Sequence, residues 1–314
     1  MIRQAAFERT GHRMLKGNLH AHSTRSDGAM APDDVMRAYA QRGYDFLALT
    51  DHRRYNLVNY APQTGIILVP GMEMDRDLPK PGSACRHCFH TVCIGPTDGN
   101  GFRQDETFPK ATVADQYEYQ TAMLDGIHGR GNLTIHCHPG WSNTPAREFE
   151  KLRGNFALEI WNSDCALTCD LDTDALYWDE LLRQGIRIFG VAGDDCHEER
   201  HIGRGWIMVN AERDLNSLLA ALERGAFYAS CGPEILDFRV EDGVARLDCS
   251  PADRIRFDMD YTPTLMFRSG DGSPVTHAEV AVDGYYSYIR ASVVDAYGRK
   301  AWTNPIFLRP QREG

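Results

Sequence analysis

The first two thirds of the chain alternate short apolar runs with amphipathic helical patterns. Apolar runs typical of buried strands occur at residues 44–50, 65–70, 133–137, 156–161 and 186–193. Amphipathic helices are predicted over residues 31–43, 174–185 and 214–225, each of which stops at a glycine. Because strands buried on both faces are typical of parallel sheets covered by helices, this alternation predicts an α/β fold.

The pattern changes near Gly232 and Pro233, and the rest of the chain is typical of an all-β region. Ile255, Phe257 and Met259 alternate with polar neighbours, which is the period of a half-buried strand. We therefore expect two domains, residues 1–231 and a small antiparallel, sandwich-like β domain over residues 232–314. A structural or oligomerisation role is the expectation for the second domain, in preference to substrate contact; the oligomeric state itself is not readable.

Composition narrows the classes of partner. The formal net charge is −10, which disfavours stable binding to nucleic acid because such binding rests on lysine and arginine. The N-terminal residues lack the apolar run of a signal peptide, and no stretch offers the roughly 20 apolar residues of a membrane span. The nine cysteines follow no small disulfide framework. These features predict a cytoplasmic protein that does not enter a membrane.

Histidine and carboxylate residues recur where the predicted strands end. They are Asp51 and His52, Glu73, His90, His136 and His138, Asp164, and Asp194, Asp195 and His197, with His20, His22 and Asp27 near the start of the chain. The carboxyl ends of strands in a parallel barrel converge on one face, where such folds place their chemistry. Imidazole and carboxylate together are ligands for Zn, Mn or Fe. The pattern predicts a centre with more than one divalent ion.

Six segments, taken in order, resemble the motifs of the PHP (polymerase and histidinol phosphatase) superfamily of metal-dependent phosphoesterases. NLHAHSTRSDG resembles its first motif, H-x-H-[ST]-x-x-S-D-G, and the others are LALTDH, PGMEM, FHTVCIG, HCHPG and GDDCH. The resemblance covers residues 17 to about 205. RGW at 204–206 and AWTNPIF near the end more loosely resemble the carbaryl-hydrolase-like branch. The resemblance implies a distorted (β/α)7 barrel as the first domain.

The resemblance also implies a ligand set for each of two or three divalent ions, Mn, Fe or Zn. The first ion would take His20, His22, Glu73 and Asp195. The second would take Glu73, His90 and His138, with Glu73 bridging, and the third Asp27, His52 and His197. All nine positions hold the expected residue type.

Three of these positions have a neighbouring alternative. His87 lies close to His90, but His90 sits in the short apolar run. His138 directly precedes Pro139 and Gly140, whereas His136 is expected on the same side of its strand as a supporting group. The D-x-H spacing to His197 selects Asp195 over Asp194.

The function that these features predict is a metal-dependent hydrolase. We expect a phosphoesterase in which a metal-bridging hydroxide cleaves a small mono-, bis- or cyclic phosphate ester. Glu73, Asp195 and His197 are the catalytic candidates, and Arg204 is a candidate for gripping the anionic substrate, since guanidinium matches phosphate. A solvated surface arginine is the competing interpretation of Arg204.

Two rival functions stay open at this stage. A carbamate, ester or amide hydrolase would use the same metal centre on a carbonyl carbon. A non-enzymatic binding module is the other rival, although a degenerate member should have lost ligands, and this chain keeps them all. Substrate identity is not readable from the sequence.

Overall fold

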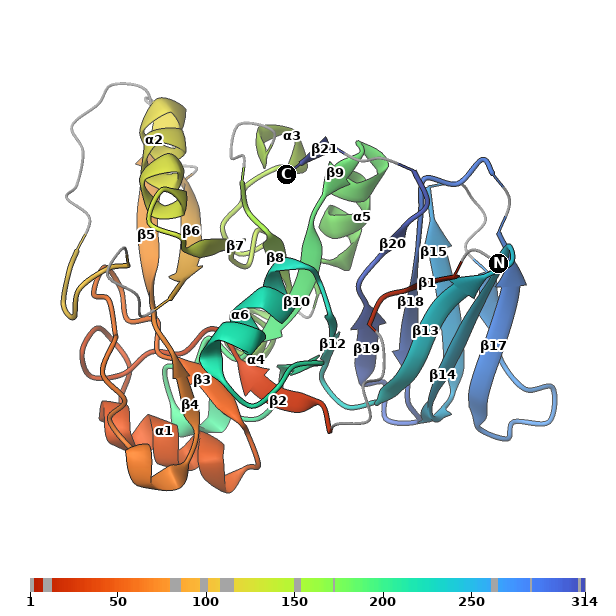
Figure 1. Cartoon of the computed structure of the whole chain (residues 1–314), viewed down its shortest axis with the longest axis horizontal. Helices are drawn as coiled ribbons and strands as arrows, with labels where there is room; N and C mark the ends of the chain where they lie inside the picture. Colours follow the sequence, from red (N-terminus) through yellow and green to blue (C-terminus); the bar gives the residue numbers. More distant parts are fainter. Residues whose placement is uncertain are drawn as a thin grey trace.

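The computed structural model describes residues 3–7, 13–79, 86–96, 101–107, 116–149, 154–171, 173–260, 265–282, 284–309 and 312–313. An α/β region occupies one end of the molecule and an all-β region, mostly blue, the other (Figure 1). No helix of the described part is long and apolar enough to cross a membrane. The sequence-based α/β interpretation of the first region is confirmed.

One sheet of the α/β region has the order β10-β8-β7-β6-β5. Its strands are β5 (Gly71–Pro79), β6 (Arg86–Ile94), β7 (Leu133–His136), β8 (Ala157–Asn162) and β10 (Phe189–Gly193). β7, β8 and β10 are parallel, but β6 runs antiparallel to both β5 and β7. The connection from β5 to β6 is too short for the crossover that a parallel pair needs, so the two strands form a hairpin.

The second sheet continues from the α/β region into the all-β region. Its order is β16-β15-β18-β19-β12-β11-β2-β3-β4, and β20 (Ile306–Phe307) also pairs with β18. The strands on the α/β side are β2 (Leu15–Asn18), β3 (Phe46–Ala48), β4 (Ile67–Val69), β11 (Trp206–Val209) and β12 (Phe227–Ser230). Only β2, β3 and β4 are parallel within it.

The expected (β/α)7 barrel is not confirmed, because no strand ladder among the described residues joins the two sheets into a closed cylinder. β4 leads into β5 with only Pro70 between them, which leaves no room for a crossover helix and removes one backbone donor. An isolated bridge between Asn56 and Gly71 links the chain there instead. At the other seam, β10 and β11 pack closely without pairing.

The all-β region packs two sheets face to face. One sheet is β1-β13-β14-β17, wholly antiparallel, in which the N-terminal strand pairs with β13. Its strands are β1 (Arg3–Ala5), β13 (Ile235–Glu241), β14 (Val244–Ala252) and β17 (Val275–Ala281). The facing strands are β15 (Arg254–Met259), β16 (Leu265–Phe267), β18 (Tyr288–Val294) and β19 (Lys300–Thr303).

The predicted alternation in β15 is confirmed, because Ile255, Phe257 and Met259 are buried. Asp258 is buried as well, since it pairs with Arg290. β12 pairs with β19, so one sheet runs across the predicted boundary at residue 231. The division into residues 1–231 and 232–314 stays a prediction.

Helices cover the outer faces of the α/β region. They are α1 (Pro32–Gln41), α2 (Gln116–His128), α3 (Ala146–Phe149), α4 (Ser163–Cys169), α5 (Ala175–Arg183) and α6 (Leu215–Glu223), with 3-10 turns η1 (Pro62–Thr64) and η2 (Glu199–His201). Two short strands, β9 (Ile186–Arg187) and β21 (Arg312–Glu313), pair beside α5. The three predicted helices correspond to α1, α5 and α6. The other helices were not predicted.

Candidate metal centre

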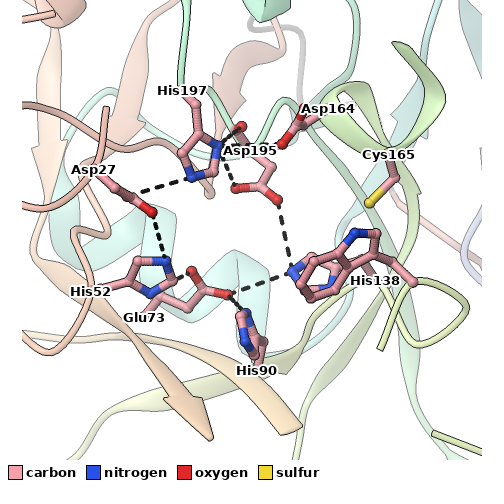
Figure 2. Close-up of a pocket in the computed structure, with 10 residues that line it drawn as sticks. Asp27, His52, Glu73, His90, His138, Asp164, Cys165, Asp195 and His197 are labelled. Atoms are coloured by element: carbon pink, nitrogen blue, oxygen red, sulfur yellow. Dashed lines mark hydrogen bonds and ion pairs between the residues drawn. The ribbon is translucent and has the colours of Figure 1, made fainter. Parts of the chain in front are cut away.

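The nine predicted ligands lie together, although they come from segments spread over the chain. They form three groups whose ligand atoms lie within 4.8 Å of one another: His20, His22, Glu73 and Asp195; Glu73, His90 and His138; and His22, Asp27, His52 and His197. Most of them line a pocket of about 170 Å³ in which their polar atoms face one another (Figure 2). The predicted groups therefore form in space, with His22 shared by two of them.

The first group has the geometry of a tetrahedral site. His20 Nε2 lies 3.2 Å from Glu73 Oε2 and 3.2 Å from Asp195 Oδ1. His22 Nε2 lies 3.1 Å from each of the same two oxygens. The two nitrogens are 3.2 Å apart. Ligands held roughly 2.0–2.1 Å from a tetrahedral ion are about 3.3–3.4 Å from one another, which is close to these edges.

Hydrogen bonding alone does not account for this arrangement. Asp195 Oδ1 and His52 Nδ1 are buried and have no hydrogen-bond partner, although charged neighbours lie close. Two imidazole nitrogens that face each other and the same two oxygens cannot all be satisfied by one proton between them. A divalent cation would satisfy these atoms at once, so the donor set fits a metal.

Glu73 presents its second oxygen to the second group. Its Oε1 lies 2.9 Å from His90 Nδ1 and 3.6 Å from His138 Nε2, while Oε2 faces the first group. Asp195 is placed similarly, because its Oδ2 lies 3.7 Å from His138 Nε2. Both side chains are buried. A carboxylate with its two oxygens in adjacent groups has the geometry of a bridging ligand.

The third group is more open. Asp27 Oδ1 lies 3.5 Å from His197 Nε2 and from His22 Nδ1, and its Oδ2 lies 3.5 Å from His52 Nε2. The Asp27 side chain is 53% exposed, whereas that of Glu73 is 1% exposed. His197 Nδ1 donates to the carbonyl oxygen of Asp195 at 2.9 Å, which turns Nε2 toward Asp27.

Glu159, on β8, supports the ligands from outside and was missed in the sequence. Its carboxylate lies 3.1 Å from His20 Nδ1 and accepts the backbone N–H of His138 and the side-chain amide of Asn162. A carboxylate behind a histidine ligand fixes its tautomer and raises its basicity. The sequence signal for it is a glutamate inside the otherwise apolar run at residues 156–161.

The backbone is strained at two of the ligands. His138 has φ of 27° and Asp195 has φ of 48°, in the left-handed region that non-glycine residues seldom adopt. His138 follows the end of β7, so the alternation of the strand does not extend to it. His136 does not join any described ligand group as a result. Burial, with the nearby charges of His138 and His90, lowers the pKa of His136 to about 3, so it is neutral.

Opposite charges inside the centre shift the pKa values of its members. Burial pushes the pKa of His20 down, but Asp195, Glu73 and Glu159 outweigh it and raise that pKa well above its usual value. In the same way burial lowers and the two carboxylates raise the pKa of His22, to about 9. Burial would raise the pKa of Glu73, but His20 and His90 bring it well below its usual value. Histidine protons thus balance the carboxylates where a cation would otherwise do so.

The alternatives to the predicted ligands lie elsewhere. Asp194 points away from the groups and accepts the backbone N–H groups of Gly203, Arg204 and Gly205 at 2.7–3.1 Å. The His87 side chain lies outside the described residues. Arg204 is exposed and does not line the metal pocket: its Nε donates to the carbonyl oxygen of Arg200. The structure therefore does not bring Arg204 to the ligands.

Besides the predicted ligands, the pocket is lined by Trp141, Asp164 and Cys165, of which only Asp164 was among the polar residues noted at strand ends in the sequence. Trp141 is 43% exposed at the pocket, and its ring centroid lies 5.1 Å from that of His138. Asp164 and Cys165 enter from α4, which Asn162 caps by accepting the backbone N–H of Cys165. Asp164 Oδ2 lies 3.5 Å from His197 Nδ1. These residues border the ligands on the side of α4.

Comparisons of the sequence find two partial relatives and no match to a family profile. The chain is 46% identical over 41 residues to a DNA polymerase/3′-5′ exonuclease PolX of Bacillus subtilis, and 35% identical over 103 residues to a 5′-3′ exoribonuclease of Haemophilus influenzae. The matched segments cover 13% and 31% of this chain. They span only 7% and 32% of those relatives.

Among solved structures, the chain is similar to a two-domain protein from Bacteroides vulgatus described as containing a predicted PHP-like metal-dependent phosphoesterase. The TM-score is 0.48 at 17% identity, over 91% of this chain and 92% of the other. An amidohydrolase from Chromobacterium violaceum gives a TM-score of 0.41 at 19% identity, over 58% and 87% of the two chains. In the order of its sequence motifs, the chain resembles the PHP-like metal-dependent phosphoesterases.

Proposed function

We propose that this chain is a metal-dependent hydrolase of the PHP superfamily and that it cleaves a small phosphate ester. The observation that carries the proposal is the convergence of four buried ligand atoms, with five of their separations at 3.1–3.2 Å. The proposed ligands are His20, His22, Glu73 and Asp195 for one ion, Glu73, His90 and His138 for a second, and Asp27, His52 and His197 for a third. Mn, Fe and Zn all suit this set.

Bound divalent ions supply Lewis acidity, which polarises a phosphoryl oxygen and acidifies water. The chain's own contribution is to hold the ligands in position beforehand. Glu159 orients His20 through Nδ1, and the Asp195 carbonyl orients His197 through Nδ1. Each imidazole thereby keeps its Nε2 lone pair directed at the pocket.

The charge of the site makes anion binding depend on the cations. The described lining of the pocket contains no lysine or arginine, and it includes the carboxylates of Asp27, Glu73 and Asp195. A phosphate would be repelled by these groups, and divalent ions invert that local potential. We therefore expect phosphate esters to bind the centre only in the metal-loaded protein.

A substrate panel tests the proposed reaction. The full chain is freed of metal with a chelator, reloaded with Mn, Fe or Zn, and assayed on p-nitrophenyl phosphate, a nucleoside phosphate and an aryl carbamate. We expect metal-dependent turnover of the phosphates, unchanged in His277→Ala, whose side chain is 49% exposed on β17. Carbamate turnover far above phosphate turnover would contradict the phosphoesterase proposal and support a carbamate hydrolase that uses the same metal centre.

Elemental analysis separates an enzyme from a binding module. We expect two or three equivalents of divalent metal in the purified or reloaded protein. A protein that binds no Mn, Fe or Zn, and that shows no turnover when these are added, would contradict the proposal.

A further inference from the structure

A second cavity, of about 450 Å³, lies beside the metal pocket. The helix α4 borders both: Asp164 and Cys165 line the metal pocket, whereas Ala166 and Leu167, the next two residues, line the second cavity. The two cavities therefore lie against neighbouring residues of the same helix.

The walls of this cavity come from both regions of the fold. Trp161 lies on β8, and Trp206 begins β11. Tyr297 and Arg299 belong to the turn between β18 and β19, in the all-β region. The all-β region thus contributes side chains to a cavity next to the candidate active site.

The segment Gly203–Trp206, which contains the RGW motif, is held firmly in the cavity wall. The buried carboxylate of Asp194, next to the ligand Asp195, accepts three successive backbone N–H groups of this segment. A Cβ on Gly205 would lie 2.4 Å from the Trp161 ring, so only glycine lets the indole approach. Lys16 Nζ lies 4.2 Å from the centre of the Trp206 ring. The wall is therefore fixed to the metal centre through Asp194.

The cavity combines aromatic faces with two guanidinium groups. Trp161, Trp206 and Tyr297 supply the rings, and Tyr297 is 85% exposed in the turn between β18 and β19. Both arginines are held through their Nε atoms: Arg204 Nε donates to the carbonyl oxygen of Arg200 at 2.8 Å, and Arg299 Nε donates to the Asp295 carboxylate at 2.7 Å. These contacts orient both guanidinium groups in the cavity wall.

We infer that this cavity binds the part of the substrate beyond the scissile bond, and that this part is a planar aromatic group with an anionic substituent. Aromatic side chains stack on planar rings, and guanidinium recognises carboxylate or phosphate. The inference rests on the proposed function, because it takes the bound molecule to be the substrate of the metal centre. It gives the all-β region a role in specificity, where the sequence favoured a structural role.

Direct binding to the metal-free full chain tests this inference without any turnover. Calorimetric titration with adenosine 5′-monophosphate, adenosine and ribose 5-phosphate separates the ring from the anion. We expect the nucleotide to bind, and each fragment to bind at least about tenfold more weakly, because each lacks one of the two contacts. Absence of nucleotide binding, or equal binding of ribose 5-phosphate, would overturn the inference.

Matched variants locate the binding. Arg204→Gln, Arg299→Gln and Tyr297→Leu should each weaken nucleotide binding about tenfold. Arg200→Gln and Tyr285→Leu are the controls, since both side chains are exposed and neither lines the cavity. Unchanged binding in the first three variants would refute the assignment.

Turnover distinguishes this inference from the proposed function. One outcome is metal-dependent cleavage of aryl and alkyl phosphates at equal rates that the three variants do not change. This result would support the phosphoesterase proposal and refute a role of the cavity in substrate recognition. Nucleotide binding that the variants weaken, in a protein without phosphatase activity, would leave the binding cavity standing and remove the proposed reaction.

Discussion

Two buried clusters of charge lie in this molecule, and they are arranged differently. In the first, Arg290 on β18 forms two parallel hydrogen bonds with Asp179 on α5, at 2.7–2.8 Å, and lies 3.1 Å from Asp258 on β15. Arg256 pairs with Asp258 from the surface side, at 3.0 Å. Two guanidinium groups thus face two carboxylates. The second cluster is the candidate metal centre, where histidines face carboxylates and no arginine or lysine lines the described pocket.

The difference shows how a structural ion pair can be distinguished from a cluster of side chains that fits a metal cation. The Arg290 cluster balances its own charge and joins α5 to the all-β region. In the metal centre, the Nε2 atoms of His20 and His22 lie only 3.2 Å from each other and converge on the same two carboxylate oxygens of Glu73 and Asp195. Burial of charge is costly in both places, but only in the second would an added cation offset that cost.

The largest expected effect is that of Glu73→Ala. If Glu73 bridges two groups, the variant should lose at least one metal equivalent, and its turnover should fall by more than the roughly 10–100-fold typical of losing an outer hydrogen-bond partner. Elemental analysis and phosphatase assays measure both effects. Glu234→Ala, at an exposed position on the β13 side, is the control. Full metal content and full activity in Glu73→Ala would disprove the bridging role.

Arg290→Met tests the other side of the comparison. Removing the shared cation leaves Asp179 buried without a charge partner and Asp258 with Arg256 alone, and breaking a buried pair typically costs about 3–5 kcal/mol of stability. Urea unfolding measures this loss, and the metal content of the folded protein should not change. Adding Asp179→Leu should recover part of the stability, because it removes one of the stranded charges. A loss below about 1 kcal/mol would show that the pair is not structural.

The sequence was sufficient to predict which histidine and carboxylate side chains lie together, because these residues are carried by short motifs. Each motif places a histidine or carboxylate at a strand end, and nothing in the rest of the chain has to be known. Glu159 was not predictable in this way, since a buried glutamate in a strand has a meaning only when its partners, His20 and Asn162, are known. Asp194 and Asp195 were separable by spacing, but the contacts of Asp194 with residues 203–205 were not.

The topology was predictable only in part. The apolar runs indicated where strands lie, yet apolar content does not give strand direction. The antiparallel β6 follows from the short connection after β5, and the seam at Pro70 follows from the absence of a crossover there. Pairing of β1 with β13, and of β12 with β19, joins residues far apart in the chain, and no local pattern records such partners.

Glu159 shares features of both clusters. Its buried carboxylate is satisfied by hydrogen bonds, and it also orients the candidate ligand His20. The variant Glu159→Gln keeps the shape but removes the charge behind His20, so metal affinity should fall about 10–100-fold. Competition with a chelator of known affinity measures this change. Glu180→Gln, exposed on α5, is the matched control. Equal affinity in both variants would mean that Glu159 only packs.

The smallest expected effect concerns His128, which shows what burial does to a histidine outside the carboxylate cluster. Its Nε2 lies 2.9 Å from Thr134 Oγ1, and burial lowers its pKa from the usual 6.5, against a smaller opposing effect of Asp125. Neutral His128 therefore contributes stability that is present above about pH 6.5 and is lost as the pH falls, because the unfolded chain then binds the proton more readily.

In His128→Gln this acid-sensitive contribution disappears, so between pH 7.5 and 5.5 the variant should lose less unfolding free energy than the wild type. The difference stays below about 1.4 kcal/mol, which is the most that protonation of an unfolded histidine with the ordinary pKa of 6.5 can contribute between these two pH values. Urea unfolding at the two pH values measures it. An equal or larger loss in the variant would show that burial does not lower the pKa of His128.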